Sequence, residues 1–322
     1  MKITTLIPAY KTQYLAELLT SLRTQTRPSD RIIIADDSPN GEFRATLFAE
    51  SMAAQRAGLA IEFYEGPRRG GYPNILHLLR IWAQSSELVH VLLDDDVIYP
   101  RFYEQHQRAH ASGVFSCSIS SRWTANEHGQ PIAGMPVPQA VATSPQRMLS
   151  LSHEVVFMST VPECKNWFGE FSNAVFTARG SEVLHRPAFE GMSYAGLWDL
   201  GAFLAASLQA PIAYIQDPLG YFRTGALGNS SKVFGPYMKA AVVGYAALAV
   251  GGRRLGRYSE AQAQGCFSII GAVVQQYYGT QPDMQAFCDL LPRLAAGDAA
   301  AQSAAEADFI LVWHAFLRQH DF

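Results

Sequence analysis

Short apolar runs alternate with longer, helix-like stretches along residues 1–120. The longer stretches repeat apolar residues at helical spacing, as Leu15, Leu18, Leu19 and Leu22 do in the first of them. Strands that alternate with helices of this length predict a mainly parallel sheet with helices on both faces. The predicted strands are Ile3–Ile7, Arg31–Ala35, Ile61–Tyr64, Leu88–Leu93 and Val114–Ser118, and the predicted helices are Gln13–Gln25, Phe43–Ala57, Tyr72–Gln84 and Arg101–Ala111.

Unusual polar or glycine-rich segments follow four of the predicted strands. Ligands of such sheets bind beyond the carboxyl ends of the strands, which meet at one edge. We therefore expect these segments to lie together and to form a binding site. They are Pro8-Ala9-Tyr10, Asp36-Asp37-Ser38, Gly66–Gly71 and Asp94-Asp95-Asp96.

The sequence pattern of the later part of the chain differs from that of residues 1–120. Residues 122–170 are punctuated by prolines and are predicted to be largely irregular. A helix is predicted near Leu197–Leu208 and an extended segment near Ile212–Ile215, and from Gly235 onward the pattern is helical. The predicted organisation is an α/β domain over 1–234, with halves 1–121 and 122–234, and a helical region over 235–322.

Composition narrows the class of protein. The net charge of −3 gives no reason to expect a nucleic-acid partner. Four dispersed cysteines and an N-terminus unlike a signal peptide predict a reduced, cytoplasmic protein. The most apolar later segment, Ala240–Gly252, is shorter than the roughly 20 residues that span a bilayer. We expect a core helix there; peripheral contact with the inner face of a membrane, through the adjacent Arg253 and Arg254, is the alternative.

The motifs, taken in order, resemble those of the family 2 glycosyltransferases. "TTLIPAYKTQYLAELLTSLRTQT" is similar to the opening strand and helix of that family, and "RIIIADDSPNG" to its second strand. "GPRRGGYPNILHLLRIWAQSSELVHVLLDDDVIYP" is similar to the segment that ends in its DXD motif. The resemblance covers about residues 1–225 and implies a GT-A fold, a UDP- or dTDP-sugar donor and inversion at the anomeric carbon. The resemblance does not extend to the helical region from residue 235 onward.

Three consecutive aspartates at a strand end repel one another unless a cation is bound. The resemblance implies that Asp96 binds Mg²⁺ or Mn²⁺ together with the donor diphosphate, and that Asp94 or Asp95 contacts the ribose or a metal-bound water. Solvated carboxylates that cap a helix near Pro100 are the alternative.

The other strand ends are candidates for nucleotide binding. Asp36 and Asp37 could accept a hydrogen bond from a uracil or thymine imide, while Tyr10 stacks on the base beside the backbone of Pro8. An Asx turn is the alternative for the two aspartates. Phosphate binding is predicted for Arg69 and Gly71, because arginine pairs with phosphate oxygens and glycine permits close approach of the backbone.

The acceptor side departs from the family pattern. The family has a Glu-Asp pair where "GLWDL" places Gly196 and Leu197, so Asp199 is the remaining candidate general base. Capping of the following helix is the alternative role for Asp199. The reserve bases are Glu190 and Glu170, and the candidate platforms for a sugar ring are Trp198 and Trp167, either of which could instead be a core aromatic.

Two further expectations concern cations and histidines. The segment 220–231 lacks the histidine that relatives supply to the metal, so Arg223 is expected to face a phosphate. His106 and His110 share a helix face at ligand spacing, but with no third ligand nearby they are expected to be an exposed pair.

These observations together predict a metal-dependent inverting glycosyltransferase. The resemblance leaves the acceptor open among a glycan, a lipid-linked group and a protein, in a bacterial glycan or glycoprotein pathway. The missing Glu-Asp pair motivates the alternative of a non-catalytic sugar-nucleotide-binding or scaffolding protein. For the helical tail, the alternatives are homodimerisation, membrane docking and binding of a polypeptide acceptor.

Overall fold

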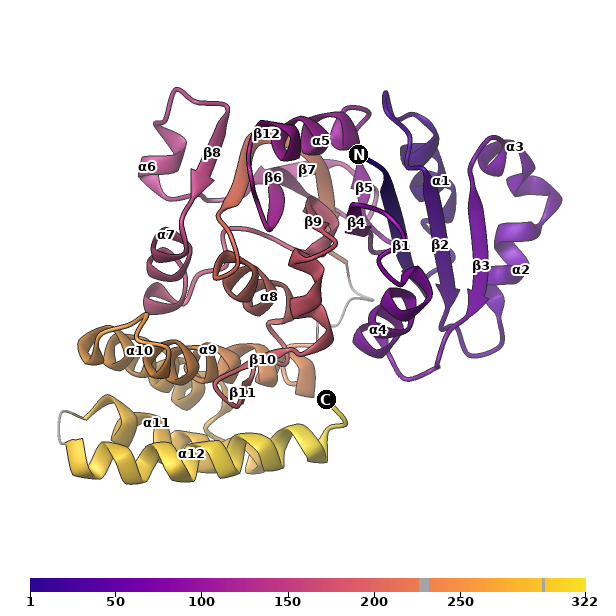
Figure 1. Ribbon diagram of the computed structural model, residues 1–322. Helices are drawn as coiled ribbons and strands as arrows, with labels where there is room; N and C mark the ends of the chain where they lie inside the picture. The colour runs from indigo at the N-terminus through magenta and orange to yellow at the C-terminus, as the bar shows by residue number, and fades with distance from the viewer. Residues whose placement is uncertain (226–231, 297–298) are drawn as a thin grey trace. The chain divides into compact units, whose positions relative to one another are not determined.

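The structure is a computed structural model, and it describes residues 1–225, 232–296 and 299–322 (Figure 1). Contacts between residues divide the chain into two units. The sheet unit comprises Met1–Leu151, Phe168–His185 and Ala206–Thr224, and the helical unit comprises Ser152–Trp167, Arg186–Ala205 and Gly225–Phe322. Two segments from the middle of the chain thus group with the C-terminal helices, and the boundary at residue 235 stays a prediction.

The described part of the sheet unit contains a ten-stranded sheet with the order β3-β2-β1-β4-β9-β6-β12-β5; β7 pairs with β6 and β8 with β12. The first four strands along the chain are mutually parallel, whereas β9, β8, β7 and β5 pair antiparallel with their neighbours. The predicted α/β fold is therefore confirmed, with a mixed rather than uniform second half. The strands are β1 Ile3–Ala9, β2 Arg31–Asp36, β3 Ile61–Glu65, β4 Leu88–Val91, β5 Val97–Ile98, β6 Cys117–Ala125, β7 Pro131–Gly134, β8 Met148–Leu151, β9 Ala174–Thr177 and β12 Ile212–Arg223.

Three longer helices flank this sheet. α1 (Leu15–Arg23) buries the predicted leucine face, α4 (Gly71–Trp82) packs on β1 and β2, and α5 (Phe102–Ser112) packs on β6 and β12. The remaining helical elements of this unit are α2 Glu42–Phe48, η1 Glu50–Met52, α3 Ala53–Arg56, α6 Gln139–Ala142, η3 Phe171–Asn173 and η4 Gly180–His185.

One predicted helix is interrupted. The stretch expected over 43–57 breaks at Ala49, which is extended with ψ of 149°. Arg56 from the following turn donates hydrogen bonds to the carbonyls of Leu47 and Ala49 at the end of α2. A tertiary capping contact therefore replaces a further turn of helix, and the apolar pattern alone does not reveal it.

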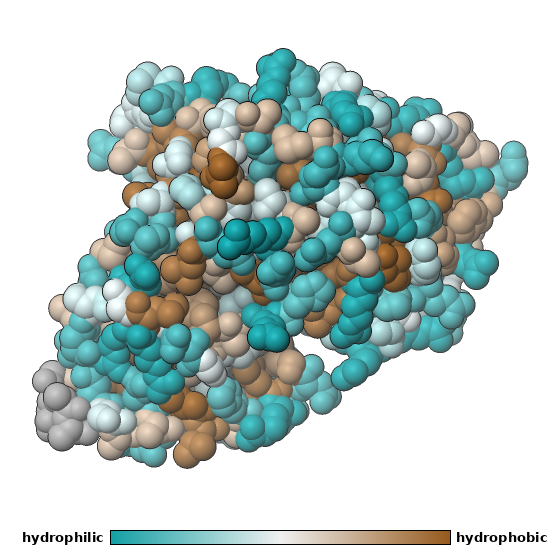
Figure 2. Space-filling model, in the orientation of Figure 1, coloured by the Kyte–Doolittle hydropathy of each residue, from teal (hydrophilic) through white to brown (hydrophobic). Residues whose placement is uncertain are grey.

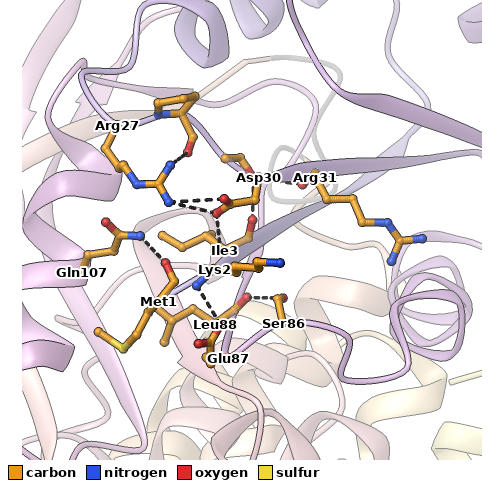
Figure 3. Close-up of polar contacts among 12 residues, drawn as sticks. Met1, Lys2, Ile3, Arg27, Asp30, Arg31, Ser86, Glu87, Leu88 and Gln107 are labelled. Atoms are coloured by element: carbon orange, nitrogen blue, oxygen red, sulfur yellow. Dashed lines mark hydrogen bonds and ion pairs between the residues drawn. The ribbon is translucent and has the colours of Figure 1, made fainter.

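The N-terminal edge of the sheet is closed by its own side chains (Figure 3). Asp30 accepts a hydrogen bond from the backbone of Ile3 at 2.9 Å and is ion-paired with Arg27. Glu87 accepts from the backbone of Lys2 at 2.7 Å. Charged groups at this edge thus serve the strand ends themselves.

The helical unit is built around α9 (Pro236–Arg254), with Gly235 as N-cap and proline in the first turn. The segment 240–252 contributes most of the buried residues of α9, which confirms the predicted core helix. The other elements of the unit are α7 His153–Met158, η2 Val161–Glu163, β10 Ala188–Phe189, β11 Met192–Ser193, α8 Trp198–Ser207, α10 Glu260–Tyr278, η6 Pro282–Met284, α11 Gln285–Ala295 and α12 Ala299–Gln319.

The arginines that follow the apolar segment are engaged within this unit. Arg253 and Arg254 both pair with Glu306 of α12, and Arg257 lies 2.7 Å from a ring nitrogen of His153. Their charge is therefore used to join helices, which gives the membrane-contact alternative no support. In the described ranges no helix is long and apolar enough to cross a bilayer. The face drawn in Figure 2 mixes hydrophilic and hydrophobic residues without a continuous apolar band.

The expectation of an exposed pair for His106 and His110 is wrong. Both rings are buried where α5 packs on β6, and the hydroxyl of Ser118 lies 2.7 Å from His106 Nδ1 and 3.0 Å from His110 Nε2. His90 of β4 is a third buried ring. Burial lowers the pKa of His90 to about 3 and of His110 to about 4, and burial together with the other two rings lowers the pKa of His106.

The three buried histidine rings predict that the folded state loses stability in acid, and a substitution can measure the contribution of one ring. Because their folded-state pKa is lowered, the unfolded chain binds protons more tightly. The stability they provide is fully present above about pH 6.5 and is lost as the pH falls. His106→Phe should therefore flatten the decline in unfolding free energy between about pH 6.5 and 4.5 by about 1.4 kcal/mol per pH unit. Urea denaturation measures this slope; the exposed His128→Gln should leave it unchanged, and an unchanged slope in His106→Phe would contradict the assignment.

Candidate functional site

The carboxyl ends of β1, β2, β3 and β4 are level, as the register requires. Ala9 is paired with Asp36, and Asp36 with Glu65, while Leu92 donates its N–H to the carbonyl of Leu6. The four segments singled out in the sequence therefore meet at one edge of the sheet unit.

Asp94 ties the end of β1 to the end of β4. Its Oδ2 accepts hydrogen bonds from the backbone N–H groups of Tyr10 and Lys11, each at 2.5 Å. Burial, and in second place the charge of Asp95, raises the pKa of Asp94 to about 7. This carboxylate positions the segment that carries Tyr10, and sequence reasoning did not assign it that role.

Asp95 is ion-paired with Lys11. The Lys11 ammonium contacts Asp95 Oδ2, and both side chains are mostly shielded from solvent. Burial opposes the charge of Lys11, but the nearby carboxylates, Asp95 first, outweigh it and raise the pKa of Lys11. Sequence reasoning missed Lys11, although its place directly after Tyr10 in "IPAYKTQY" was a usable signal.

Asp96 is the most deeply buried of the three aspartates. Its residue exposure is 1 %, its Oδ1 accepts the backbone N–H of Arg223 at 3.2 Å, and its Oδ2 has no hydrogen-bond partner among the described residues. Burial and the charge of Asp95 raise the pKa of Asp96 well above its usual range. An orphaned carboxylate oxygen in such surroundings costs free energy, so a bound cation or donor group would satisfy it.

A buried polar network holds the strand that leads to the triplet. His90 Nε2 lies 2.9 Å from the carbonyl oxygen of Ser172, so this nitrogen carries the proton and Nδ1 accepts from the hydroxyl of Tyr103 at 3.1 Å. The hydroxyl of Ser172 in turn accepts the N–H of Leu93 at 3.0 Å. The backbone just before Asp94 is thereby fixed in direction.

Asp36 forms the Asx turn that was the alternative prediction. Its Oδ1 accepts from the N–H and hydroxyl of Ser38, and its Oδ2 accepts the N–H of Arg44 at 2.9 Å. Asp37 binds the next loop, with Oδ1 accepting from the N–H of Arg68 and Oδ2 from that of Gly70 at 2.9 Å. Both carboxylates shape the edge; their contact with a nucleobase stays a prediction.

The groups that could contact a nucleotide differ in exposure. Tyr10 is 56 % exposed, so its ring face is open to stacking, while Pro8 is buried at the end of β1. Arg69 and Gly71 are exposed, and Gly71 begins α4, where the helix dipole favours an anion. Their placement at the edge is compatible with the predicted roles.

The prediction that Arg223 faces a phosphate is wrong. Its side chain is 1 % exposed, and its guanidinium donates to Glu17 at 2.6 Å, to the carbonyl of Asp95 at 3.1 Å and to that of Glu127 at 2.7 Å. It also lies over the ring of Tyr14. Arg223 therefore joins Glu17 and Glu127 to the backbone of the triplet. Residues 226–231 of the same predicted segment lie outside the described residues.

The residues at the triplet fit a divalent cation that is shared with a ligand. In the parts of the chain described, no three His, Cys, Asp or Glu side chains are grouped so as to hold a metal by themselves. Mg²⁺ at phosphate-transfer and nucleotide sites commonly takes one or two carboxylates and completes its shell with phosphates and water. The unpartnered oxygen of Asp96 and the carboxylate of Asp95 match that pattern, whereas Asp94 is committed to the backbone.

The acceptor-side candidates belong to the helical unit. Asp199 and Trp198 occupy the first turn of α8 and are half-buried, and the ring centroids of Trp198 and Phe322 are 6.4 Å apart. Trp167 is 3 % exposed and donates from its indole N–H to Ser159 at 3.0 Å, which favours the core alternative for this tryptophan.

Gly196, the first position at which the resemblance leads one to expect a Glu-Asp pair, has no room for a side chain. Its φ is +81°, and a Cβ at this position would lie 2.4 Å from the backbone nitrogen of Ala241 and 2.6 Å from the carbonyl carbon of Ala240. The backbone of α9 thus occupies the space that a side chain would need. Within this unit, a side chain at position 196 would therefore require α9 to shift.

Gly196→Ala should lower the free energy of unfolding by about 2–4 kcal/mol, because left-handed strain adds to overlap with α9. Gly191 provides the matched control: its φ is +75° but nothing lies within 4 Å of a built Cβ. Gly191→Ala should cost only the strain, about 1 kcal/mol. Equal losses for the two variants in chemical denaturation would refute the close approach of α9.

The two reserve bases lie in different surroundings. Glu170 is in the sheet unit, ion-paired with the buried Arg122 at 2.5 Å; burial raises its pKa and Arg122 opposes the rise. Glu190 is exposed, at φ +49°, between β10 and β11. Glu170 lies close enough to raise the pKa of Asp96, but its pairing with Arg122 makes it a poor proton acceptor.

Comparisons with known proteins agree with this arrangement. Residues 4–159 match the family described as glycosyl transferase family 2. No curated protein matches the chain in sequence.

Several solved structures share the fold. S. aureus TarS matches with a TM-score of 0.58 and 13% identity over 98% of this chain, which spans 55% of that chain. TarS 1-349 in complex with UDP-GlcNAc matches with a TM-score of 0.54 and 16% identity, covering 99% of this chain and 92% of that one. The mannosyltransferase PcManGT from Pyrobaculum calidifontis, in complex with GDP-Man and Mn²⁺, has a TM-score of 0.52 and 14% identity, with 98% and 86% covered. These likenesses show the GT-A fold.

Proposed function

We propose that this chain, whose residues 4–159 match the family described as glycosyl transferase family 2, transfers a sugar from a UDP- or dTDP-sugar to an acceptor hydroxyl, with inversion and with a divalent cation. The observation that carries the proposal is the aspartate triplet at the shared edge of four parallel strands, where Asp96 Oδ2 is buried and has no hydrogen-bond partner within the described ranges.

The donor assignment is supported by the groups at that edge. Tyr10 offers an exposed ring for stacking at the edge that the buried Asp36 and Asp37 shape, and a uracil or thymine imide would have to share carboxylate oxygens that already accept protein hydrogen bonds. Arg69 and the start of α4 at Gly71 supply positive potential for the diphosphate. TarS, a relative in fold, is described in complex with UDP and with UDP-GlcNAc.

The leaving group determines the electrostatic requirement. Negative charge grows on the nucleoside diphosphate as the glycosidic bond breaks, and a bound Mg²⁺ or Mn²⁺ supplies Lewis-acid stabilisation of that charge. Asp96, with Asp95, would hold the cation against the diphosphate. PcManGT, another relative in fold, is described with Mn²⁺.

Asp199 is the proposed general base. It would take the proton from the acceptor hydroxyl as that oxygen attacks the anomeric carbon from the face opposite the diphosphate. Trp198, directly before it, is the proposed platform for the apolar face of a sugar ring. The acceptor class, whether glycan, lipid-linked group or protein, is left to experiment.

Incubation of the protein with a panel of nucleotide sugars, with and without Mn²⁺, tests the proposal. We expect metal-dependent release of UDP or dTDP from one donor, increased by the acceptor and abolished by EDTA. Tight UDP binding with no release from any donor would contradict the enzymatic proposal.

That negative outcome would favour a non-catalytic sugar-nucleotide-binding protein instead. The observation on its side is the close approach of α9 to Gly196, which leaves no room for a side chain at the first position of the Glu-Asp pair that the resemblance leads one to expect. In that case Asp199→Asn would change neither nucleotide affinity nor any turnover.

A further inference from the structure

We propose that Lys11 is a built-in counter-ion of the aspartate triplet. While the donor is absent, the Lys11 ammonium occupies the cation position on Asp95. When metal and nucleotide bind together, the ammonium moves to the donor diphosphate. The inference rests on the proposed function, because it assumes that the triplet accepts a metal with a nucleotide. It makes Lys11 a residue that couples the two ligands.

The contacts of Lys11 support a fixed position beside the triplet. Its backbone N–H donates to Asp94 Oδ2 at 2.5 Å, and its ammonium is ion-paired with Asp95 Oδ2. The same residue is therefore anchored through its main chain to one aspartate and through its side chain to the next. Exposures of 23 % for the Lys11 side chain and 16 % for that of Asp95 keep most solvent away from the pair.

The Lys11 ammonium and a divalent metal ion therefore compete for the carboxylate of Asp95. An ammonium and a divalent metal at hydrogen-bond or ligand distance from one carboxylate would repel each other at short range in poorly screened surroundings. The neighbouring carboxylates are poor alternatives for the ammonium: Asp94 Oδ2 already accepts two backbone N–H groups, and Asp96 Oδ2, which has no partner among the described residues, is the oxygen proposed to bind the metal. Metal binding must therefore displace the ammonium from Asp95.

A diphosphate gives the displaced ammonium a new partner. The four-carbon stem of lysine is flexible, and its ammonium binds phosphate oxygens as a point charge. With the backbone of Lys11 held at the mouth of the triplet, the side chain needs only a rotamer change. Metal alone should thus bind weakly, and nucleotide should raise its affinity; by linkage, metal raises the affinity for nucleotide equally.

Mn²⁺ titration of the full chain by calorimetry, with and without UDP, tests the inference in the wild type, Lys11→Met and Lys11→Arg. Lys165→Met is the control, because Lys165 also pairs with a carboxylate, Glu163, but on the surface of the other unit. We expect Lys11→Met to bind Mn²⁺ without UDP at least about fivefold more tightly, as removal of a competing ion pair implies. The gain in Mn²⁺ affinity that UDP brings should shrink by a similar factor.

Lys11→Arg should retain the weak binding of metal alone, and Lys165→Met should match the wild type. Unchanged or weaker Mn²⁺ binding by Lys11→Met would overturn the inference; if the wild type still binds UDP with Mn²⁺, the proposed function survives that result. Absence of Mn²⁺ binding by every variant, with and without UDP, would overturn both the inference and the metal requirement.

Discussion

Asp199→Asn is expected to lower the rate of sugar transfer by about 10³-fold while leaving UDP affinity within about twofold of the wild type. General-base catalysis by a positioned carboxylate contributes about 10²–10⁴-fold, and asparagine cannot accept the proton. Asp199 lies in the first turn of α8, in "GLWDL", the segment in which the resemblance predicts the general base.

The helix-capping alternative makes a different prediction. An acidic residue in the first turn of a helix stabilises it by about 0.3–1 kcal/mol through the helix dipole. If that were the only role of Asp199, the Asp199→Asn variant would unfold at a slightly lower temperature and keep the wild-type rate of sugar transfer. Transfer kinetics, UDP calorimetry and thermal unfolding of the same preparation separate the two roles. Asp308→Asn, an exposed carboxylate on α12, is the control for loss of a charge.

Asp96→Asn should also abolish metal-dependent transfer, with a loss of about 10³-fold or more, and should leave the fold as stable or more stable. The expected loss follows from electrostatic stabilisation of a leaving group, where each 1.4 kcal/mol corresponds to about tenfold in rate. Asparagine keeps an acceptor for the N–H of Arg223 but removes a buried charge whose second oxygen has no partner among the described residues.

If Asp96→Asn retains or gains stability but loses activity, Asp96 is present for function and not for stability. Asp94→Asn provides the contrast, because Asp94 Oδ2 accepts from Tyr10 and Lys11 and its loss should destabilise the edge by about 1–3 kcal/mol. Chemical denaturation and Mn²⁺ binding measure the two effects. A strongly destabilised Asp96→Asn that still binds Mn²⁺ and transfers sugar would contradict the assignment of Asp96.

The sequence was sufficient to predict the first half of the fold and which segments meet at one edge of the sheet. Strands β1 to β4 carry local apolar patterns, and parallel strands joined by helices bring their carboxyl ends to one edge. The segments after those strands are therefore neighbours whatever the details of packing. The family motifs add the chemistry that these neighbours are expected to perform, and the match over residues 4–159 agrees with it.

The second half of the sheet was harder to predict for a physical reason. β9, β6 and β12 pair with strands far away in the chain, and several of the shorter strands lie in a stretch rich in proline. Pairing between segments so far apart depends on contacts between distant residues, which a local pattern does not encode.

By itself, the sequence determined which residues reach the functional edge, because strand direction and the order of elements are local properties. Only the tertiary structure decided what each of those residues does there. Asp94 and Lys11 became partners across two strands, Arg223 was buried against the backbone of the triplet, and α9 filled the space beside Gly196. Such roles depend on distances of a few ångströms between segments far apart in the chain, where a shift of one side chain separates an ion pair from a free charge.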